Sequence, residues 1–133
     1  MKKFLFMGIM ALFSANALAV TDHYFLRDGN HVHHLKITKI GEDITVSMDV
    51  NFEPNANEED NKPCSADISG EAKANGEHQI ILKKQPVGEA LYCTLTVNLT
   101  ANGAKVEQSE DCKYFASGIC HFDSVDKELI RIK

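Results

Sequence analysis

The chain has 133 residues, 44% of them hydrophobic and 25% charged, with a formal net charge of −5 and four cysteines. This length suffices for one domain with a modest core. An acidic chain without a basic stripe argues against nucleic acid and anionic membrane surfaces as ligands. Its charge would instead attract a cationic partner.

Residues 1–19 have the pattern of a secretory signal peptide. The segment begins with two lysines, continues as an apolar run and ends in the small-x-small sequence of residues 17–19. Because a membrane span needs about 20 apolar residues, we expect no span after cleavage. We therefore expect a periplasmic or secreted protein. Its single domain, residues 20–133, carries 12 basic and 19 acidic side chains and a formal charge of −7.

Apolar and polar side chains alternate between turn sequences that recur about every 8–12 residues, and no window has helical spacing. The pattern predicts about eight short strands, the last of them at an edge. In chain order they are 23–27, 31–40, 43–53, 64–74, 77–84, 91–100, 104–112 and 127–132. We therefore predict an all-β domain, either a small antiparallel sandwich or a barrel.

The turn between residues 40 and 43 indicates how the strands on either side of it pair. Gly41-Glu42, as a two-residue turn with glycine first, sets Ile37 opposite Val46 and, further along, Leu35 opposite Met48. Both predicted pairs match an apolar residue with an apolar residue.

The stretch 89–120 is expected to organise the rest of the domain. Its first strand ends at Asn102-Gly103, the dipeptide that most readily adopts the positive φ angles of a two-residue hairpin turn. Such a turn sets Leu99 opposite Val106. It also brings the two cysteines of this hairpin face to face at its open end.

All four cysteines lie after the signal peptide, and an even number in an exported chain indicates two disulfides. The hairpin register favours Cys93–Cys112, which leaves Cys64–Cys120. The pairing Cys64–Cys93 with Cys112–Cys120 remains open as the alternative.

Histidines gather near the start of the strand at 31–40. On a strand, His31 and His33 project to one face about 6.5–7 Å apart, a spacing that two imidazole ligands of one metal ion can use. A third ligand would come from His23, His78 or His121, and the metal would be zinc or copper. The alternative interpretation is that these are ordinary histidines near a strand end. No other cofactor is expected.

No catalytic residues are predicted. Ser117 lies four residues before His121, but the chain has no G-x-S-x-G elbow, and every cysteine has an expected disulfide partner. We therefore expect no enzymatic activity.

Aromatic residues beside the cysteines are candidates for a binding face. Tyr92 would point away from the apolar side of its strand, and Tyr114 and Phe115 would be presented by a rigid, disulfide-held segment at low entropic cost. The alternative is that Phe115 and Phe122 cover the end of the core, since aromatic side chains close to cysteines commonly serve packing.

The Ala116-Ser117-Gly118 sequence, together with the signal peptide, the disulfides and the acidic domain, resembles the small exported bacterial β-barrel inhibitors of lysozyme. In that family a loop with a Ser-Gly core enters the lysozyme cleft. After Gly118 this chain has Ile119, Cys120 and His121 in place of an arginine or tyrosine. The resemblance implies a non-enzymatic inhibitor that occludes a lysozyme, and immunity proteins against a toxin share the same size, export and charge. In either case we expect a cationic protein partner that contacts residues 113–121. The expected binding residues are Tyr92, Tyr114, Phe115, Ser117, Gly118 and His121.

Overall fold

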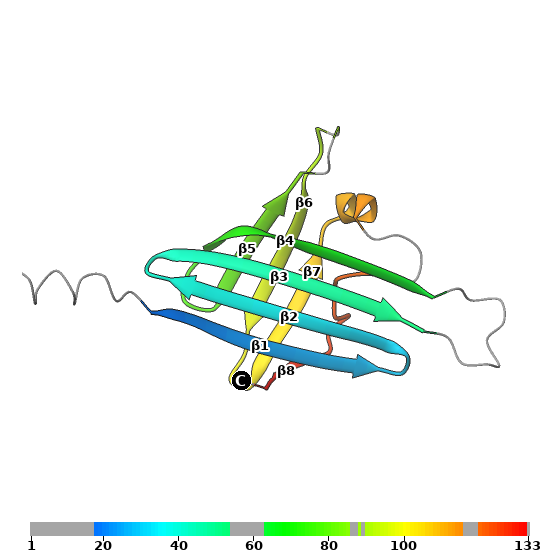
Figure 1. Cartoon of the computed structure of the whole chain (residues 1–133), viewed down its shortest axis with the longest axis horizontal. Coiled ribbons are helices and arrows are strands. Elements are labelled where there is room, and N and C mark those ends of the chain that lie inside the picture. Colours follow the sequence, from blue (N-terminus) through cyan, green and yellow to red (C-terminus); the bar gives the residue numbers. More distant parts are fainter. Residues whose placement is uncertain (1–17, 54–62, 86–87, 89, 116–119, 133) are drawn as a thin grey trace, which may run out of the picture.

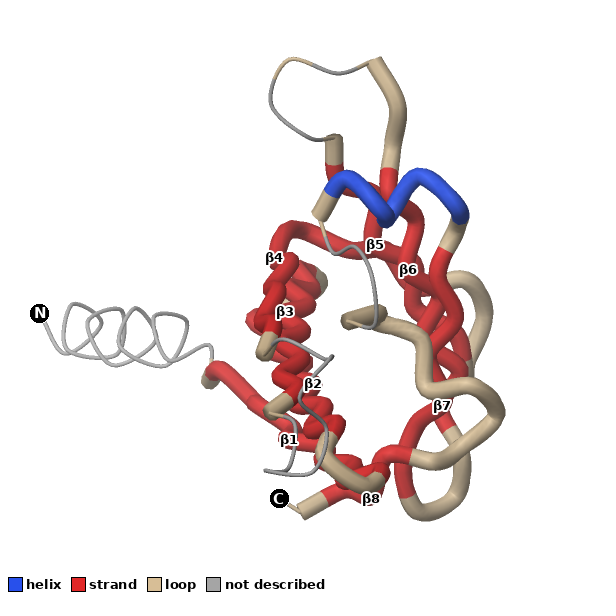
Figure 2. The backbone as a smooth tube through the Cα atoms, turned by 90° about the vertical axis from the view of Figure 1, so that its right-hand side faces the viewer, coloured by secondary structure: helices blue, strands red, loops and turns tan. Residues whose placement is uncertain are grey.

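The structure, a computed structural model, is described here for residues 18–53, 63–85, 88, 90–115 and 120–132. Eight antiparallel strands form a closed barrel in which each strand pairs with the next and the last pairs with the first (Figure 2). The strands are β1 (Ala19–Asp28), β2 (His31–Ile40), β3 (Asp43–Phe52), β4 (Cys64–Ala74), β5 (Gln79–Lys84), β6 (Cys93–Leu99), β7 (Gly103–Gln108) and β8 (Leu129–Arg131). The all-β prediction is confirmed, and the fold is the barrel rather than the sandwich.

The barrel has a corner at β4. Strands β1 to β4 run alongside one another, and β5 to β7 cross them steeply (Figure 1). β4 pairs with β3 over Cys64–Ala72 but with β5 only over Ala72–Ala74. At Gly70 an added Cβ would lie 3.2 Å from a methyl group of Leu82. Glycine therefore allows the side chains of β5 to close against β4 where the strand bends.

The turn at Gly41-Glu42 has the expected geometry. Gly41 has a φ of 61°, a conformation that glycine adopts without a steric penalty. Ile37 pairs with Val46, and Leu35 pairs with Met48, as predicted. The pairing register of β2 and β3 follows from this turn. The first strand, β1, begins at Ala19 and is therefore longer than the predicted strand at 23–27.

The core consists of apolar side chains that alternate inward along the strands. Burying one such side chain of the size of Leu, Ile or Met stabilises the fold by about 1.5–3 kcal/mol. The largest buried side chains are Phe122, Leu35, Ile37, Met48, Leu82, Leu95, Leu129, Val46, Val97 and Val106. Phe122 is the only one of these outside a strand.

The expected hairpin at Asn102-Gly103 is wrong in two respects. Neither residue has a positive φ. Leu99 pairs with Ala104 rather than Val106, so the register is shifted by two residues from the expected one. The reason lies in the neighbouring strand, because Gly103 already belongs to β7 and pairs with β8.

β8 is not the edge strand that the sequence suggested, because it pairs on both sides. Ile130 lies opposite Gly103 of β7 and opposite Phe25 of β1. A Cβ added to Gly103 would lie 1.9 Å from the carbonyl oxygen of Leu129. Glycine is therefore required here by the close approach of β8, which closes the barrel, and not by turn geometry.

Both preferred disulfides are present, so the alternative pairing is wrong. Cys93–Cys112 joins residues 19 apart in the chain, and Cys64–Cys120 joins residues 56 apart. Such cross-links stabilise by restricting the unfolded chain, by about 3 and about 4 kcal/mol for loops of these lengths.

The structural element that brings Cys93 and Cys112 together differs from the expected one. β7 ends at Gln108, so Cys112 does not lie across a ladder from Cys93. A short 3₁₀ helix, η1 (Glu110–Tyr114), turns the chain back instead and brings the Cα atoms of the two cysteines to 4.3 Å.

Candidate functional site

One end of the barrel, here called the disulfide end, gathers most of the candidate residues. Because neighbouring strands run in opposite directions, this end holds the starts of β2, β4 and β6 and the ends of β1, β3, β5 and β7. His31 begins β2, Cys64 begins β4 and Cys93 begins β6. The two disulfides therefore attach η1 and the segment after it, residues 120–124, to this end.

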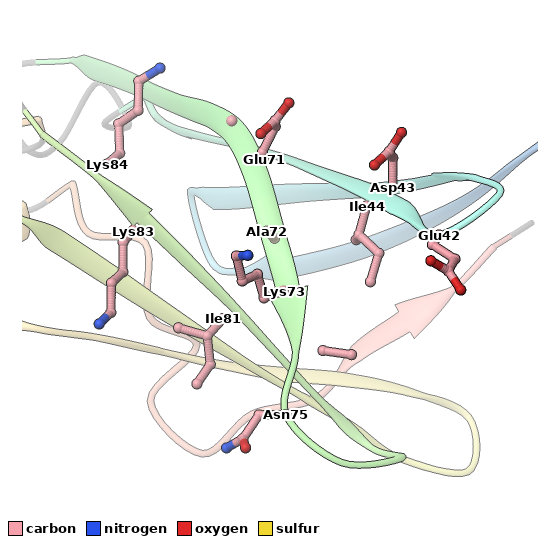
Figure 3. A pocket seen from close by; sticks show the side chains of 12 residues that line it. Glu42, Asp43, Ile44, Glu71, Ala72, Lys73, Asn75, Ile81, Lys83 and Lys84 are labelled. Carbon is pink, nitrogen blue, oxygen red and sulfur yellow. The ribbon is translucent and has the colours of Figure 1, made fainter.

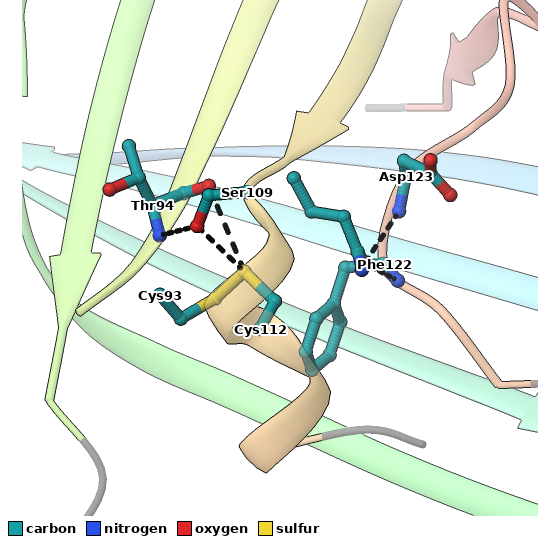
Figure 4. The surroundings of a disulfide bond; sticks show 7 residues. Cys93, Thr94, Ser109, Cys112, Phe122 and Asp123 are labelled. Atoms are coloured by element: carbon teal, nitrogen blue, oxygen red, sulfur yellow. Dashed lines mark hydrogen bonds between the residues drawn. A yellow bond between two sulfur atoms is a disulfide. The ribbon is translucent and has the colours of Figure 1, made fainter. Parts of the chain in front are cut away.

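η1 is anchored through one side chain. Cys112 is its only buried residue, and the disulfide that it forms with Cys93 is fully buried. The residue before the helix, Ser109, makes two hydrogen bonds to Thr94. Its hydroxyl accepts from the Thr94 N–H at 2.9 Å (Figure 4). Its backbone N–H donates to the Thr94 carbonyl at 3.0 Å. The base of η1 is thus held by one covalent bond and two hydrogen bonds.

Two exposed tyrosines flank this disulfide. Tyr92 is 52% exposed and Tyr114 is 47% exposed. Tyr92 precedes Cys93, and Tyr114 follows Cys112 by two residues, so each tyrosine lies beside one of the bonded cysteines in the chain. Leu91 beside them is also exposed, at 39%. The site thus presents apolar and aromatic surface on a covalently fixed support.

The remaining residues of the expected contact segment divide into two groups. Phe115 packs, partly buried, against the core, and Phe122 is fully buried, as the core-covering alternative predicted. A contact between Phe115 and a partner stays a prediction. Ser117 and Gly118, the centre of the lysozyme-inhibitor resemblance, lie outside the described residues.

Residues 120–124, here called the plug, cross the opening of the ring (Figure 2). The backbone N–H of Phe122 donates to Gln108 Oε1 at 2.6 Å, and that of Asp123 donates to the same oxygen at 3.3 Å. Ser124 donates its N–H to the Val106 carbonyl at 2.9 Å and accepts from the Val106 N–H at 3.0 Å. The plug is therefore fixed beside β7 by one backbone–backbone hydrogen bond and by bonds that involve side chains. The sequence carried no sign of these contacts, because the partners lie 14 to 18 residues apart without a strand pattern.

The histidines meet at the same end. The ring centroid of His121 lies 5.7 Å from that of His31 and 5.7 Å from that of His33. His31 also contacts the ring of Phe52, at 4.5 Å between centroids. The structure thus brings one of the three suggested partners, His121, to the predicted pair.

Among the described residues, no three His, Cys, Asp or Glu side chains are placed so that they could hold a metal ion. The other two suggested ligands, His23 and His78, are exposed. The His31 and His33 side chains are therefore not assigned as ligands.

His33 is a buried, neutral imidazole. It is 2% exposed, and its Nδ1 has no hydrogen-bond partner among the described residues. Burial, helped by the nearby His121 and His31, lowers the pKa of His33 to about 4. In contrast, Nδ1 of His121 lies 2.9 Å from the Asp123 carbonyl oxygen and 2.5 Å from its carboxylate. Both partners only accept, so this nitrogen carries a hydrogen.

A groove of about 1020 Å³ lies on β3, β4 and β5 (Figure 3). Asp43 and Glu71 line one part of it, and Lys73 and Lys83 line another. The described lining residues include no serine, cysteine or histidine that could act as a nucleophile or base there. None of the residues predicted from sequence as binding or metal residues lies in this groove, so the disulfide end remains the candidate site.

No protein-family model, curated protein or solved structure matches this chain. No helix in the described part of the chain is long and apolar enough to cross a membrane. The two disulfides are compatible with an exported protein.

Proposed function

We propose that this protein is an exported, non-enzymatic binding protein of inhibitor or immunity type that occludes a partner protein with residues 113–121. The observation that carries the proposal is the pair Tyr92 and Tyr114, exposed on either side of a buried disulfide. Tyrosine is enriched at the residues that dominate binding energy. A support fixed before binding reduces the entropic cost of association.

Charge supports a cationic partner. After removal of residues 1–19 the domain would have a formal charge of −7, which speeds encounter with positively charged proteins. The resemblance of residues 116–118 to the Ser-Gly loop of lysozyme inhibitors makes a lysozyme the first partner to test. A toxin bound by an immunity protein of this charge would likewise be expected to be positively charged.

Metal binding through His31 and His33 was the alternative function. Metal binding has less support than partner binding, because the described residues give these two histidines no third ligand in metal-binding geometry. Calorimetry with zinc and copper on the wild type and His33→Ala would detect such a site directly.

The binding proposal is tested by titrating the oxidised protein into lysozymes of several types while complex formation and lysozyme activity are measured. Tyr92→Ala and Tyr114→Ala are each expected to weaken the complex by about 10- to 100-fold, as truncation of a central aromatic contact does. Ile132→Ala provides a matched control, because Ile132 is 61% exposed but follows β8 at the opposite end of the barrel. The Ile132→Ala variant should bind the lysozyme with the same affinity as the wild type.

Failure of every lysozyme to bind would remove the lysozyme version of the proposal. A toxin captured from the secretions of neighbouring cells would then have to show the same dependence on Tyr92 and Tyr114. If both tyrosine variants bind a partner as well as Ile132→Ala does, the site assignment is wrong.

A further inference from the structure

Three imidazole rings lie at the mouth of the barrel, between the strands and the plug. His31 and His33 come from β2, and His121 comes from the plug, with its ring 5.7 Å from each of the others. His33 is almost completely buried, and its Nδ1 has no hydrogen-bond partner among the described residues. The binding function proposed above makes no use of this arrangement.

The surroundings of His33 suit only the neutral ring. The charged and titratable groups that act on it are His31 on its own strand, Asp28 at the end of β1, and His121 and Asp123 in the plug. Its paired neighbours on β1 and β3 are apolar. A proton added to His33 would therefore place a charge in a buried site where its Nδ1 has no hydrogen-bond partner among the described residues.

The two carboxylates nearby are already engaged. Asp123 accepts from Nδ1 of His121, and Asp28 accepts from Nζ of Lys127 at 2.6 Å. Neither hydrogen-bonds His33 directly. Movement of the plug away from β2 would allow a charged His33 ring to be hydrated, since His121 belongs to the plug and its ring lies 5.7 Å from that of His33.

We propose that the packing of His31, His33 and His121 forms an acid-sensitive latch, and that mildly acidic solution increases the fraction of molecules in which the plug is displaced from the end of the barrel. The Cys64–Cys120 disulfide keeps the displaced segment attached to β4. An effect of this opening on partner binding rests on the proposed function, because Cys120 and His121 belong both to the plug and to the proposed contact segment. The opening itself does not depend on that function.

Native-state hydrogen exchange of the full oxidised domain, with EDTA and without any partner, tests the latch. Protection of the plug amides of Phe122, Asp123 and Ser124 is compared with protection of the amides within β3, at pH 7 and pH 5, after correction for intrinsic exchange. The pKa of His33 is about 4 in the closed state. With its ordinary value near 6.5 in the open state, protection of the plug amides should fall about 20-fold between these pH values. The plug should also exchange faster than β3 and with less dependence on denaturant, because it opens locally.

His33→Phe keeps a buried ring but removes the titrating group. In this variant the pH-dependent loss of plug protection should shrink to less than about 3-fold. His78→Gln is the matched control, because the His78 side chain is 80% exposed and should leave the 20-fold change intact. An unchanged loss in His33→Phe would overturn the latch.

The comparison within the wild-type protein decides the question even if His33→Phe does not fold. If the plug amides exchange at both pH values only together with the β3 amides, through global unfolding, the mouth has no separate opening and the proposal is wrong. The same holds if protection of the plug does not change between pH 7 and pH 5.

Discussion

Among single residues, Gly103 has the clearest structural requirement. The backbone of β8 passes so close that a Cβ at this position would overlap the Leu129 carbonyl oxygen. Because the obstacle is backbone rather than a flexible side chain, it cannot rotate away. Gly41 differs, since it has a φ of 61° and no heavy atom within 4 Å of the position its Cβ would occupy. The first glycine is required by packing and the second by conformation.

Gly103→Ala should therefore lower the free energy of unfolding by about 3 kcal/mol or more, because β8 must shift and its pairing with β7 is lost. Gly41→Ala should cost only about 1–2 kcal/mol, the strain of a left-handed conformation. Urea denaturation at pH 7 measures both. An equal loss in the two variants would contradict the packing argument.

Among the elements, η1 has the least support of its own. It has five residues, and only Cys112 is buried. A helix of this length cannot persist in water by itself, because too few hydrogen bonds offset the cost of ordering its backbone. Its position, and with it the position of Tyr114, therefore depends on the disulfide to Cys93 and on the bonds of Ser109 to β6.

Removal of this disulfide in a Cys93→Ala/Cys112→Ala variant should detach η1 while the barrel persists. Amide protection across residues 110–115 should be lost, and the free energy of unfolding should fall by about 3 kcal/mol, as expected for a loop of 19 residues. Hydrogen exchange and urea denaturation provide the two measurements. If the η1 amides keep their protection, the disulfide does not hold the helix.

The Cys64→Ala/Cys120→Ala variant serves as the comparison. It opens a longer loop, of 56 residues, and should cost about 4 kcal/mol while leaving the η1 amides protected.

At the scale of the whole molecule, the burial of one imidazole makes stability depend on pH. The pKa of His33 is lowered to about 4, mainly by burial. The unfolded chain takes up a proton at this side chain below about pH 6.5, and the folded chain does not do so until the pH nears 4. Stability is therefore complete above pH 6.5 and decreases as the pH falls. The hydrogen bond from Lys127 lowers the pKa of Asp28 below its ordinary value of 3.8, so the stability that this carboxylate contributes is present at neutral pH and is lost only as the pH falls toward and below that value.

The free energy of unfolding should thus fall by about 3 kcal/mol between pH 7 and pH 4 and stay level above pH 7. Urea denaturation at several pH values measures the curve. His33→Phe should flatten it through this window, and His78→Gln should not. A curve for His33→Phe that matches the wild type would assign the pH dependence to other groups.

Whether a contact in this protein can be predicted from the sequence depends on how far apart in the chain its residues lie. Gly41-Glu42 predicted the pairing of β2 with β3 correctly, because the turn and its strands are contiguous. Asn102-Gly103 has equally strong turn chemistry, but the approach of β8, more than 25 residues later, overrides it. The same distinction applies to the candidate site. Tyr92 and Tyr114 could be placed together from the expected disulfide, whereas the contact between the plug and β7 had no local signal.

The alternation of apolar and polar residues by itself determined that the chain forms strands, and the even number of cysteines indicated two disulfides. Alternation is local, since side chains alternate across a strand, whereas Cys93 and Cys112 meet through η1 and not through the expected hairpin register. Closure by β8, insertion of the plug and burial of His33 were decided only by the tertiary structure. These features depend on segments far apart in the chain competing for the same space, and such contacts leave no periodic pattern in the sequence.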